Sequence, residues 1–216
     1  MTRTVKLAIF DMDGTILYTL DDITLSTNHA LGQFGFPGRT AEQVRAAVGN
    51  GARMLIARSL PAGTSDEMID DVFREFLLHY RDHCNDFSRP YDGIADTLRA
   101  IRARGIMTAV LSNKPDGQVR ELARQHFPGL FDFSMGERPD TGRKPSPEPV
   151  KYLLSQLGVL REQAVYIGDS DVDFQTAVNS HLPFIGVSWG FRESSLLQSL
   201  GAEHIARVPA DILRFL

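Results

Sequence analysis

Short, strongly hydrophobic runs recur along the chain and alternate with segments whose hydrophobic residues have helical spacing. The runs at 5–10, 106–111, 164–167 and 182–187 are compact and rich in aliphatic residues, which predicts buried strands. Helical spacing is found between them at 94–101, 119–123 and 150–157, with glycines after the first and third segments as expected helix ends. This alternation predicts an α/β fold: a Rossmann-like parallel sheet core with helices on both faces.

The segment from about residue 20 to about residue 84 breaks the alternation. It has no convincing buried strand, and instead carries amphipathic helical patterns at 23–34, 42–48, 52–60 and 67–83. A helical block that follows the first strand predicts an inserted α-helical cap domain. We expect the cap to cover residues 17–85 and the Rossmann-like core to comprise residues 1–16 and 86–216.

Composition narrows the class of protein. The chain has 216 residues, 43% of them hydrophobic, and a formal net charge of −4, which gives no indication of a nucleic-acid partner. An anionic substrate would therefore need local cations or a metal. The chain has one cysteine, no signal-peptide pattern and no apolar stretch long enough to span a membrane. These features predict a cytoplasmic enzyme, either a monomer or a homodimer.

Polar residues follow three of the predicted strands. Asp11 and Asp13 come after the first, Ser112-Asn113-Lys114 after the second, and Asp169, with Asp173 one helical turn later, after the third. Parallel strands end at one edge of a sheet, where ligands bind in open α/β folds, so we expect these residues to converge. Lys144 precedes a predicted helix and is placed to reach the same edge.

These residue types favour phosphoryl transfer. Carboxylates crowded in a cleft repel one another, and a hard divalent cation with oxygen ligands, Mg²⁺ rather than Zn²⁺, relieves that repulsion. Lys144 and the Ser112 hydroxyl are suited to phosphate oxygens, and Asn113 can donate through its backbone or side chain. Gly14 permits a sharp turn after the first strand. Catalysis in such a site is mostly positioning and charge neutralisation.

The four motifs are similar to those of one superfamily, and they occur in its order. Asp11-Met-Asp13-Gly-Thr15, Ser112-Asn113-Lys114, Lys144-Pro145 and Gly168-Asp169-Ser-Asp171-Val-Asp173 resemble the haloacid dehalogenase superfamily of aspartate-nucleophile phosphatases. The resemblance implies that Asp11 attacks phosphorus, that Asp13 acts as acid and base, and that Lys144 and Ser112 hold phosphoryl oxygens. It implies that Mg²⁺ contacts Asp11, the Asp13 carbonyl and Asp169, with Asp173 bound directly or through water. Gly14, Thr15 and Asn113 are assigned to substrate binding.

The helical insertion and the Ser-Asn-Lys motif look like the phosphoglycolate phosphatase group. Residues 48–51, Val-Gly-Asn-Gly, are similar to a glycine-containing specificity loop of that group, and Arg53 follows them as a candidate contact for a substrate carboxylate. The expected substrate is a small phosphorylated metabolite. Trp189 follows the fourth strand and is given two alternatives, core packing or the rim of the site.

Three other functions remain open at this point. A phosphomutase of the β-phosphoglucomutase type shares nearly all core residues and differs in how its cap controls water. A 2-haloacid dehalogenase shares the nucleophile but needs neither the acid at Asp13 nor a metal. A non-enzymatic phospho-switch also combines an acidic cluster, a hydroxyl and a lysine, but would have no helical insertion.

Overall fold

The structure is a computed structural model and describes residues 4–216. It divides the chain into two compact units: one formed by the chain up to Leu17 together with Pro90–Leu216, the other by Tyr18–Arg89. Each of the two crossings between the units lies in a short strand, β2 (Leu17–Tyr18) or β3 (Arg89–Pro90), and these two strands form a sheet of their own.

The first unit is built on a six-stranded sheet. Its strands are β1 (Leu7–Phe10), β4 (Met107–Pro115), β5 (Phe133–Glu137), β6 (Ala164–Gly168), β7 (Phe184–Val187) and β8 (His204–Ala206). They are arranged in the order β5-β4-β1-β6-β7-β8, and all neighbouring pairs are parallel. The chain moves outward from β1 to β5 and then returns to β6 on the other side of β1. The carboxyl ends of β1 and β6 therefore flank the point where the direction of winding reverses, the usual place for a ligand.

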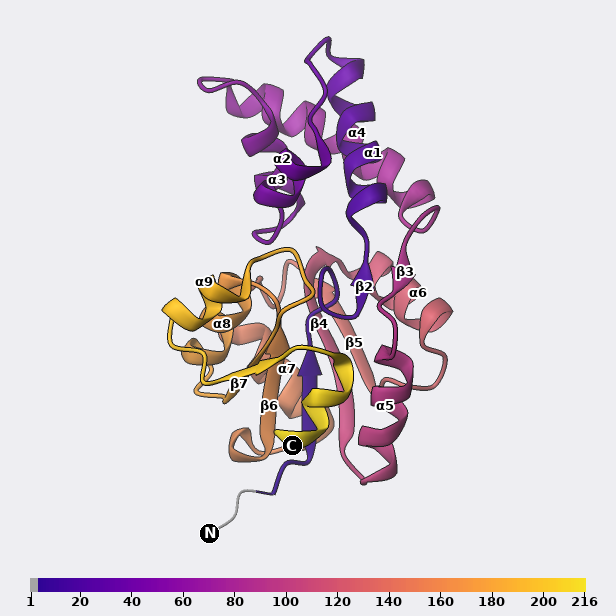
Figure 1. Ribbon diagram of the computed structural model, residues 1–216. Coiled ribbons are helices and arrows are strands. Elements are labelled where there is room, and N and C mark those ends of the chain that lie inside the picture. Colours follow the sequence, from indigo (N-terminus) through magenta and orange to yellow (C-terminus); the bar gives the residue numbers. More distant parts are fainter. Residues whose placement is uncertain (1–3) are drawn as a thin grey trace. The chain divides into compact units, whose positions relative to one another are not determined.

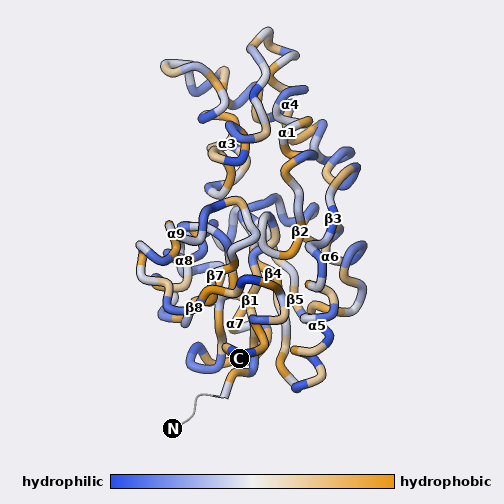
Figure 2. Tube along the Cα trace, viewed as in Figure 1, coloured by the Kyte–Doolittle hydropathy of each residue, from blue (hydrophilic) through white to orange (hydrophobic). Residues whose placement is uncertain are grey.

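Both faces of this sheet are covered by helices (Figure 1). The helices are α5 (Ile94–Ala103), α6 (Asp116–His126), α7 (Glu148–Leu157), α8 (Asp171–Asn179) and α9 (Ser194–Ser199), with short 3₁₀ turns at Arg161–Gln163 and Pro209–Arg214. Side chains alternate along β1: Ala8 and Phe10 pack with residues of α5 and α6, whereas Leu7 and Ile9 pack with residues of α7, α8 and α9. Figure 2 shows hydrophobic colour concentrated along the strands, as expected for a sheet buried on both faces.

The predicted fold class is confirmed, and two strands were missed. The four predicted strands correspond to β1, β4, β6 and β7. Strand β5 has the sequence Phe-Ser-Met-Gly-Glu, and β8 spans only three residues, so neither shows a continuous hydrophobic run. Both lie at the edges of the sheet, where less burial is needed. Strand β4 also extends through the Ser-Asn-Lys motif, with a shift of register against β5 after Leu111.

The second unit is helical. It contains α1 (Leu20–Gln33), α2 (Ala41–Ala47), α3 (Ala52–Ser59) and α4 (Asp66–His83), and α1 packs extensively along α4. The buried carboxylate of Asp22 in α1 accepts hydrogen bonds from the backbone N–H groups of Phe87 and Ser88 and from the Ser88 hydroxyl. These bonds tie the start of the unit to its end. Across residues 4–216, none of the helices is both long and apolar enough to cross a bilayer.

Candidate active site

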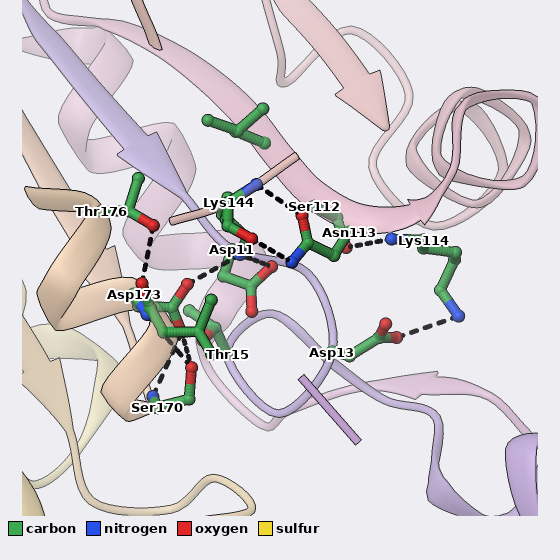
Figure 3. Close-up of polar contacts among 12 residues, drawn as sticks. Asp11, Asp13, Thr15, Ser112, Asn113, Lys114, Lys144, Ser170, Asp173 and Thr176 are labelled. Atoms are coloured by element: carbon green, nitrogen blue, oxygen red, sulfur yellow. Dashed lines mark hydrogen bonds and ion pairs between the residues drawn. The ribbon is translucent and has the colours of Figure 1, made fainter. Parts of the chain in front are cut away.

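Asp11 comes directly after β1 and is buried at the carboxyl edge of the sheet. Its backbone N–H donates to the Ile167 carbonyl of β6 at 2.9 Å, which fixes the main chain here. Nζ of Lys144 lies 2.8 Å from Oδ1 of Asp11 (Figure 3). Burial raises the pKa of Asp11 well above its usual range, the charge of Asp173 adds to the increase, and Lys144 opposes it. The carboxylate form, which a nucleophile needs, thus depends on nearby positive charge.

Lys144 is buried between two carboxylates. Its Nζ lies 2.8 Å from Asp11 Oδ1 and 2.7 Å from Asp173 Oδ1. Burial by itself would lower the pKa of Lys144, but the two carboxylates outweigh burial and raise that pKa well above its usual range. The Asn113 side chain holds the main chain of Lys144 from both sides, donating to its carbonyl at 2.9 Å and accepting from its N–H at 2.8 Å. Lys144 is therefore a fixed, permanently charged group.

Asp169 comes directly after β6 and is 1% exposed. Its Oδ1 accepts from the Thr15 hydroxyl at 3.0 Å, and its Oδ2 accepts from the Phe191 N–H at 2.7 Å. Burial, followed by the charge of Asp173, raises the pKa of Asp169 to about 7. Two donors thus orient this carboxylate, but they do not offset the loss of its hydration.

Asp173 lies in the first turn of α8 and has no exposed surface. Its Oδ2 accepts from the N–H and the hydroxyl of Ser170, at 3.1 and 2.6 Å, while the Ser170 hydroxyl accepts from the Asp173 N–H at 3.2 Å. This reciprocal pair is the capping box of α8. With Oδ1 turned to Lys144, both oxygens of Asp173 have protein partners. The observed contacts therefore favour an indirect part for Asp173 in any metal site.

The donor set fits a hard divalent cation. Asp11, Asp169 and Asp173 each offer a carboxylate oxygen within 4.8 Å of the others, and all three are buried. Within residues 4–216, Lys144 is the only cation that forms ion pairs with these three carboxylates, so their negative charge exceeds the positive charge paired with it. The raised pKa values of Asp11 and Asp169 express that excess. A bound cation would remove it, and oxygen ligands favour Mg²⁺.

The loop after β1 approaches Asp169 very closely. Gly14 has a φ of +82°, and a Cβ on it would lie 2.5 Å from Asp169 Oδ2, so no other residue fits there without a shift. Thr15 is fully buried, and its hydroxyl is already donated to Asp169. These two residues shape the wall of the site beside Asp169. Their predicted contact with substrate stays a prediction.

The other predicted residues have different surroundings. Ser112 is buried, and its hydroxyl oxygen accepts from the Lys114 N–H at 3.2 Å. Arg53 belongs to the helical unit, where its guanidinium forms ion pairs with Asp70 at 2.6 Å and Asp66 at 3.1 Å. The Arg53 guanidinium, which was expected to bind a substrate carboxylate, is thus already paired with two carboxylates of its own unit. Its contact with substrate stays a prediction.

Residues 8–187 match the sequence model of the haloacid dehalogenase-like hydrolases, a stretch that contains Asp11, Lys144 and Asp169. The chain belongs to the haloacid dehalogenase-like hydrolase family. This match confirms the predicted superfamily. It also accounts for the position of the buried cluster at the switch point of the sheet.

Relatives across the family extend over nearly the whole chain. A phosphoglycolate phosphatase of Mannheimia succiniciproducens is 30% identical over 222 residues, covering 99% of both chains. An N-acetylmuramic acid 6-phosphate phosphatase of Pseudomonas aeruginosa is 32% identical over 195 residues, covering 87% of this chain and 83% of its own. A crystal structure from Lactobacillus delbrueckii subsp. bulgaricus superposes with a TM-score of 0.92 at 36% identity, covering 97% of each chain. The predicted resemblance to the phosphoglycolate phosphatase group and the predicted enzyme class are confirmed.

Three residues near the family motifs were not assigned roles from sequence. Lys114 is buried, and its Nζ lies 3.1 Å from Asp13 Oδ1. Trp189 packs against the core, and its indole N–H donates to the Thr15 carbonyl at 3.0 Å, in the loop after β1. Ser170 caps α8. The sequence signal that could have identified Lys114 is its place as the third residue of the Ser-Asn-Lys motif.

Proposed function

We propose that the protein is a Mg²⁺-dependent phosphatase that hydrolyses a small phosphate monoester through a phosphorylated Asp11. The observation that carries the proposal is the buried cluster of Asp11, Asp169 and Asp173 around Lys144. A nucleophilic carboxylate, a metal-binding carboxylate and a fixed ammonium at one sheet edge are the groups that phosphoryl transfer requires.

Asp11 and Asp169 would hold the metal, joined by the Asp13 carbonyl that the family resemblance implies. Asp173 supports the site by fixing Lys144, in keeping with its two occupied oxygens. When bound, Mg²⁺ supplies charge neutralisation for the phosphoryl oxygens and for the carboxylates.

The chemical steps are assigned to this chain's own residues. A carboxylate oxygen of Asp11 attacks phosphorus, an O–P bond forms, and the bond to the alcohol oxygen breaks. Asp13 donates a proton to that oxygen, and the alcohol leaves. Asp13 then takes a proton from water, whose oxygen attacks phosphorus and releases phosphate from Asp11. Lys144 and Ser112 hold the phosphoryl oxygens in both steps, and Asn113 keeps Lys144 in place.

The relatives point to the kind of ester. The substrates named for two of them, phosphoglycolate and N-acetylmuramic acid 6-phosphate, are both phosphate monoesters of an alcohol group in a molecule that also carries a carboxylate. We propose phosphoglycolate as the first substrate to test. The helical unit 18–89 acts as the cap in this proposal, with Arg53 and residues 48–51 as its candidate specificity residues. A cytoplasmic location and a monomeric or homodimeric state stay predictions from the sequence.

Phosphate release tests this proposal directly. We expect the purified protein to hydrolyse phosphoglycolate with Mg²⁺ and to lose activity in excess EDTA. Asp11→Asn should lower kcat by at least about 1,000-fold, because an amide is a far weaker nucleophile than a carboxylate. Asp171→Asn is the matched control, since Asp171 is half exposed near the same edge and has no assigned role.

Each outcome of this assay separates one alternative. Full activity of Asp11→Asn would contradict the nucleophile. Activity that persists in EDTA, together with release of halide from 2-haloacids, would favour the dehalogenase. Conversion of a sugar phosphate to its isomer without net phosphate release would favour the phosphomutase.

A further inference from the structure

A second buried lysine lies beside the proposed acid and base. Lys114 belongs to β4, its side chain is 3% exposed, and its Nζ is 3.1 Å from Asp13 Oδ1. Figure 3 shows the Asp13 carboxylate turned toward Lys114, while Lys144 occupies the other side of Asp11. The site therefore contains two separate lysine–carboxylate groups, one at the nucleophile and one at the acid and base.

The main chain that carries Lys114 is fixed. Its N–H donates to the Ser112 hydroxyl, and its carbonyl lies against Gly136 of β5, where an added Cβ would be 2.3 Å from that oxygen. The Gly136 N–H is itself held by the Asp116 carboxylate at 2.9 Å. Lys114 thus projects from a rigid part of the sheet, which is the preorganisation that a binding residue needs.

The Asp13 ion pair conflicts with the proposed work of Asp13. To exchange a proton with the leaving oxygen, the Asp13 carboxyl must come within hydrogen-bond reach of that oxygen. When Asp13 acts as the acid it holds a proton and is neutral, so in that state it no longer offers Lys114 a negative charge. A buried ammonium that loses a carboxylate partner is strongly disfavoured unless another anion replaces it. A substrate whose alcohol part carries its own anion close to the ester oxygen would supply that replacement.

We propose that Lys114 binds an anionic group, a carboxylate next to the ester carbon, on the alcohol part of the substrate. The proposal rests on the proposed phosphatase function and adds to it the residue that would recognise the acid group of the substrate. Lys144 is engaged by Asp11 and Asp173 at the phosphoryl end, which leaves Lys114 as the lysine adjacent to the leaving group. Binding of the substrate carboxylate to Lys114 releases Asp13 for proton transfer.

The test compares two esters that differ only in this group. Phosphoglycolate carries a carboxylate where 2-hydroxyethyl phosphate carries a neutral CH₂OH. We expect the wild-type protein to show a higher kcat/KM for phosphoglycolate by about 100-fold or more, the scale of a charged hydrogen bond to a buried group. Equal kcat/KM values for the two esters would overturn the proposal without any variant.

Lys114→Met isolates the contribution of the ammonium. Loss of Lys114 also disturbs Asp13, but that disturbance affects both esters and cancels in the ratio of their kcat/KM values. We expect the ratio to fall by about 10- to 100-fold. Lys114→Gln, which keeps a polar side chain without the charge, should give the same loss of preference. Lys151→Met, at an exposed lysine of α7, is the matched control and should leave the ratio unchanged.

Binding separates this proposal from the proposed function. With Asp11→Asn protein and Mg²⁺, calorimetric titration of the two esters should show tighter binding of phosphoglycolate, and Lys114→Met added to that background should abolish the difference. A wild-type protein that hydrolyses neither ester would contradict the proposed function, while the binding difference would still support Lys114. A preference that survives in both Lys114 variants would overturn the role of Lys114.

Discussion

Charge compensation governs the buried residues at the carboxyl edge of the sheet. Asp11 and Asp169 both have raised pKa values, because burial and the charge of Asp173 disfavour their ionised forms. Lys144 relieves part of this repulsion through its ion pairs with Asp11 and Asp173. A divalent cation could relieve the remaining repulsion by binding the carboxylates. Because protons bind the same oxygens, metal binding and proton binding should compete at this site.

That competition predicts a pH dependence of metal stabilisation. The pKa of Asp169 is raised to about 7 in the metal-free protein, above its value in an unfolded chain. The native state therefore holds an extra proton below about pH 7, and metal-free stability falls as pH rises through that value. Mg²⁺ should therefore raise Tm more at pH 8 than at pH 5.5. The free energy of unfolding should increase by up to about 2.7 kcal/mol when the Mg²⁺ concentration is 100 times Kd.

Differential scanning calorimetry with Mg²⁺ or EDTA at the two pH values measures this effect. Asp169→Asn is the control and should lose the Mg²⁺ shift at both pH values. A shift of equal size at pH 5.5 and pH 8 would contradict the assignment of Asp169 to the metal.

Sequence patterns identified the charged residues well, because Asp11, Lys144 and Asp169 belong to motifs at recognisable strand ends. The sequence did not indicate which of these side chains contact one another. The substrate contact assigned to Asn113 stays a prediction, and the sequence did not indicate that its amide also holds the Lys144 main chain. Lys114 contacts Asp13 and Trp189 contacts Thr15. Each partner is far away in sequence, and local spacing contains no information about such contacts.

At the scale of elements, the segments that follow β1, β5, β6 and β7 build the acidic cluster: they contain Asp11, Lys144, Asp169 and Phe191 in that order. The start of α8 is the clearest case, because its cap also holds a site residue: Ser170 binds the Asp173 carboxylate that positions Lys144. Runs of aliphatic residues were sufficient to predict the inner strands. The edge strands β5 and β8 were not predicted, because pairing with their neighbours in the sheet, rather than their own hydrophobicity, stabilises them.

The cap of α8 gives a prediction with a close control. Ser170→Ala should lower the free energy of unfolding by about 1 kcal/mol, as expected for loss of an N-cap. It should also lower kcat/KM by about 10- to 100-fold, because a displaced Asp173 no longer fixes Lys144. Ser65 caps α4 in the helical unit with the same type of bond, to the Met68 N–H.

Urea unfolding and phosphatase kinetics on both variants separate the two effects. Ser65→Ala should cost similar stability and leave the kinetics unchanged. If Ser170→Ala also kept wild-type kinetics, the Asp173 carboxylate would not be needed to position Lys144.

At the scale of the whole molecule, the chain divides into a catalytic unit and a helical unit. All described residues of the acidic cluster, together with Lys144 and Lys114, lie in the first unit. The chain leaves and re-enters this unit through β2 and β3, which pair with each other. A helical insertion was recognisable because its hydrophobic period differs from that of the strands around it. Its relation to the core was not, since no local pattern encodes it.

Deleting the helical unit tests its proposed role as a cap. Replacing residues 18–89 by a short Gly-Ser linker should leave a folded core that still shows the Mg²⁺-dependent increase in Tm. Its kcat/KM for phosphoglycolate should fall by at least about 100-fold, because exclusion of water and positioning of the substrate are lost. Calorimetry and phosphate release measure the two properties. A core with undiminished kcat/KM would contradict the cap role.

The central claim is that Asp11 is phosphorylated during turnover. Acid quenching in the first turnover, reduction with borohydride and peptide mass spectrometry test it, because reduction converts an aspartyl-phosphate to homoserine. We expect homoserine at position 11 when substrate and Mg²⁺ are present, and unmodified aspartate when substrate is omitted. Homoserine at any other aspartate would contradict phosphorylation of Asp11. So would an unmodified Asp11 in protein quenched while the phosphorylated form should accumulate, that is, when dephosphorylation is the slow step.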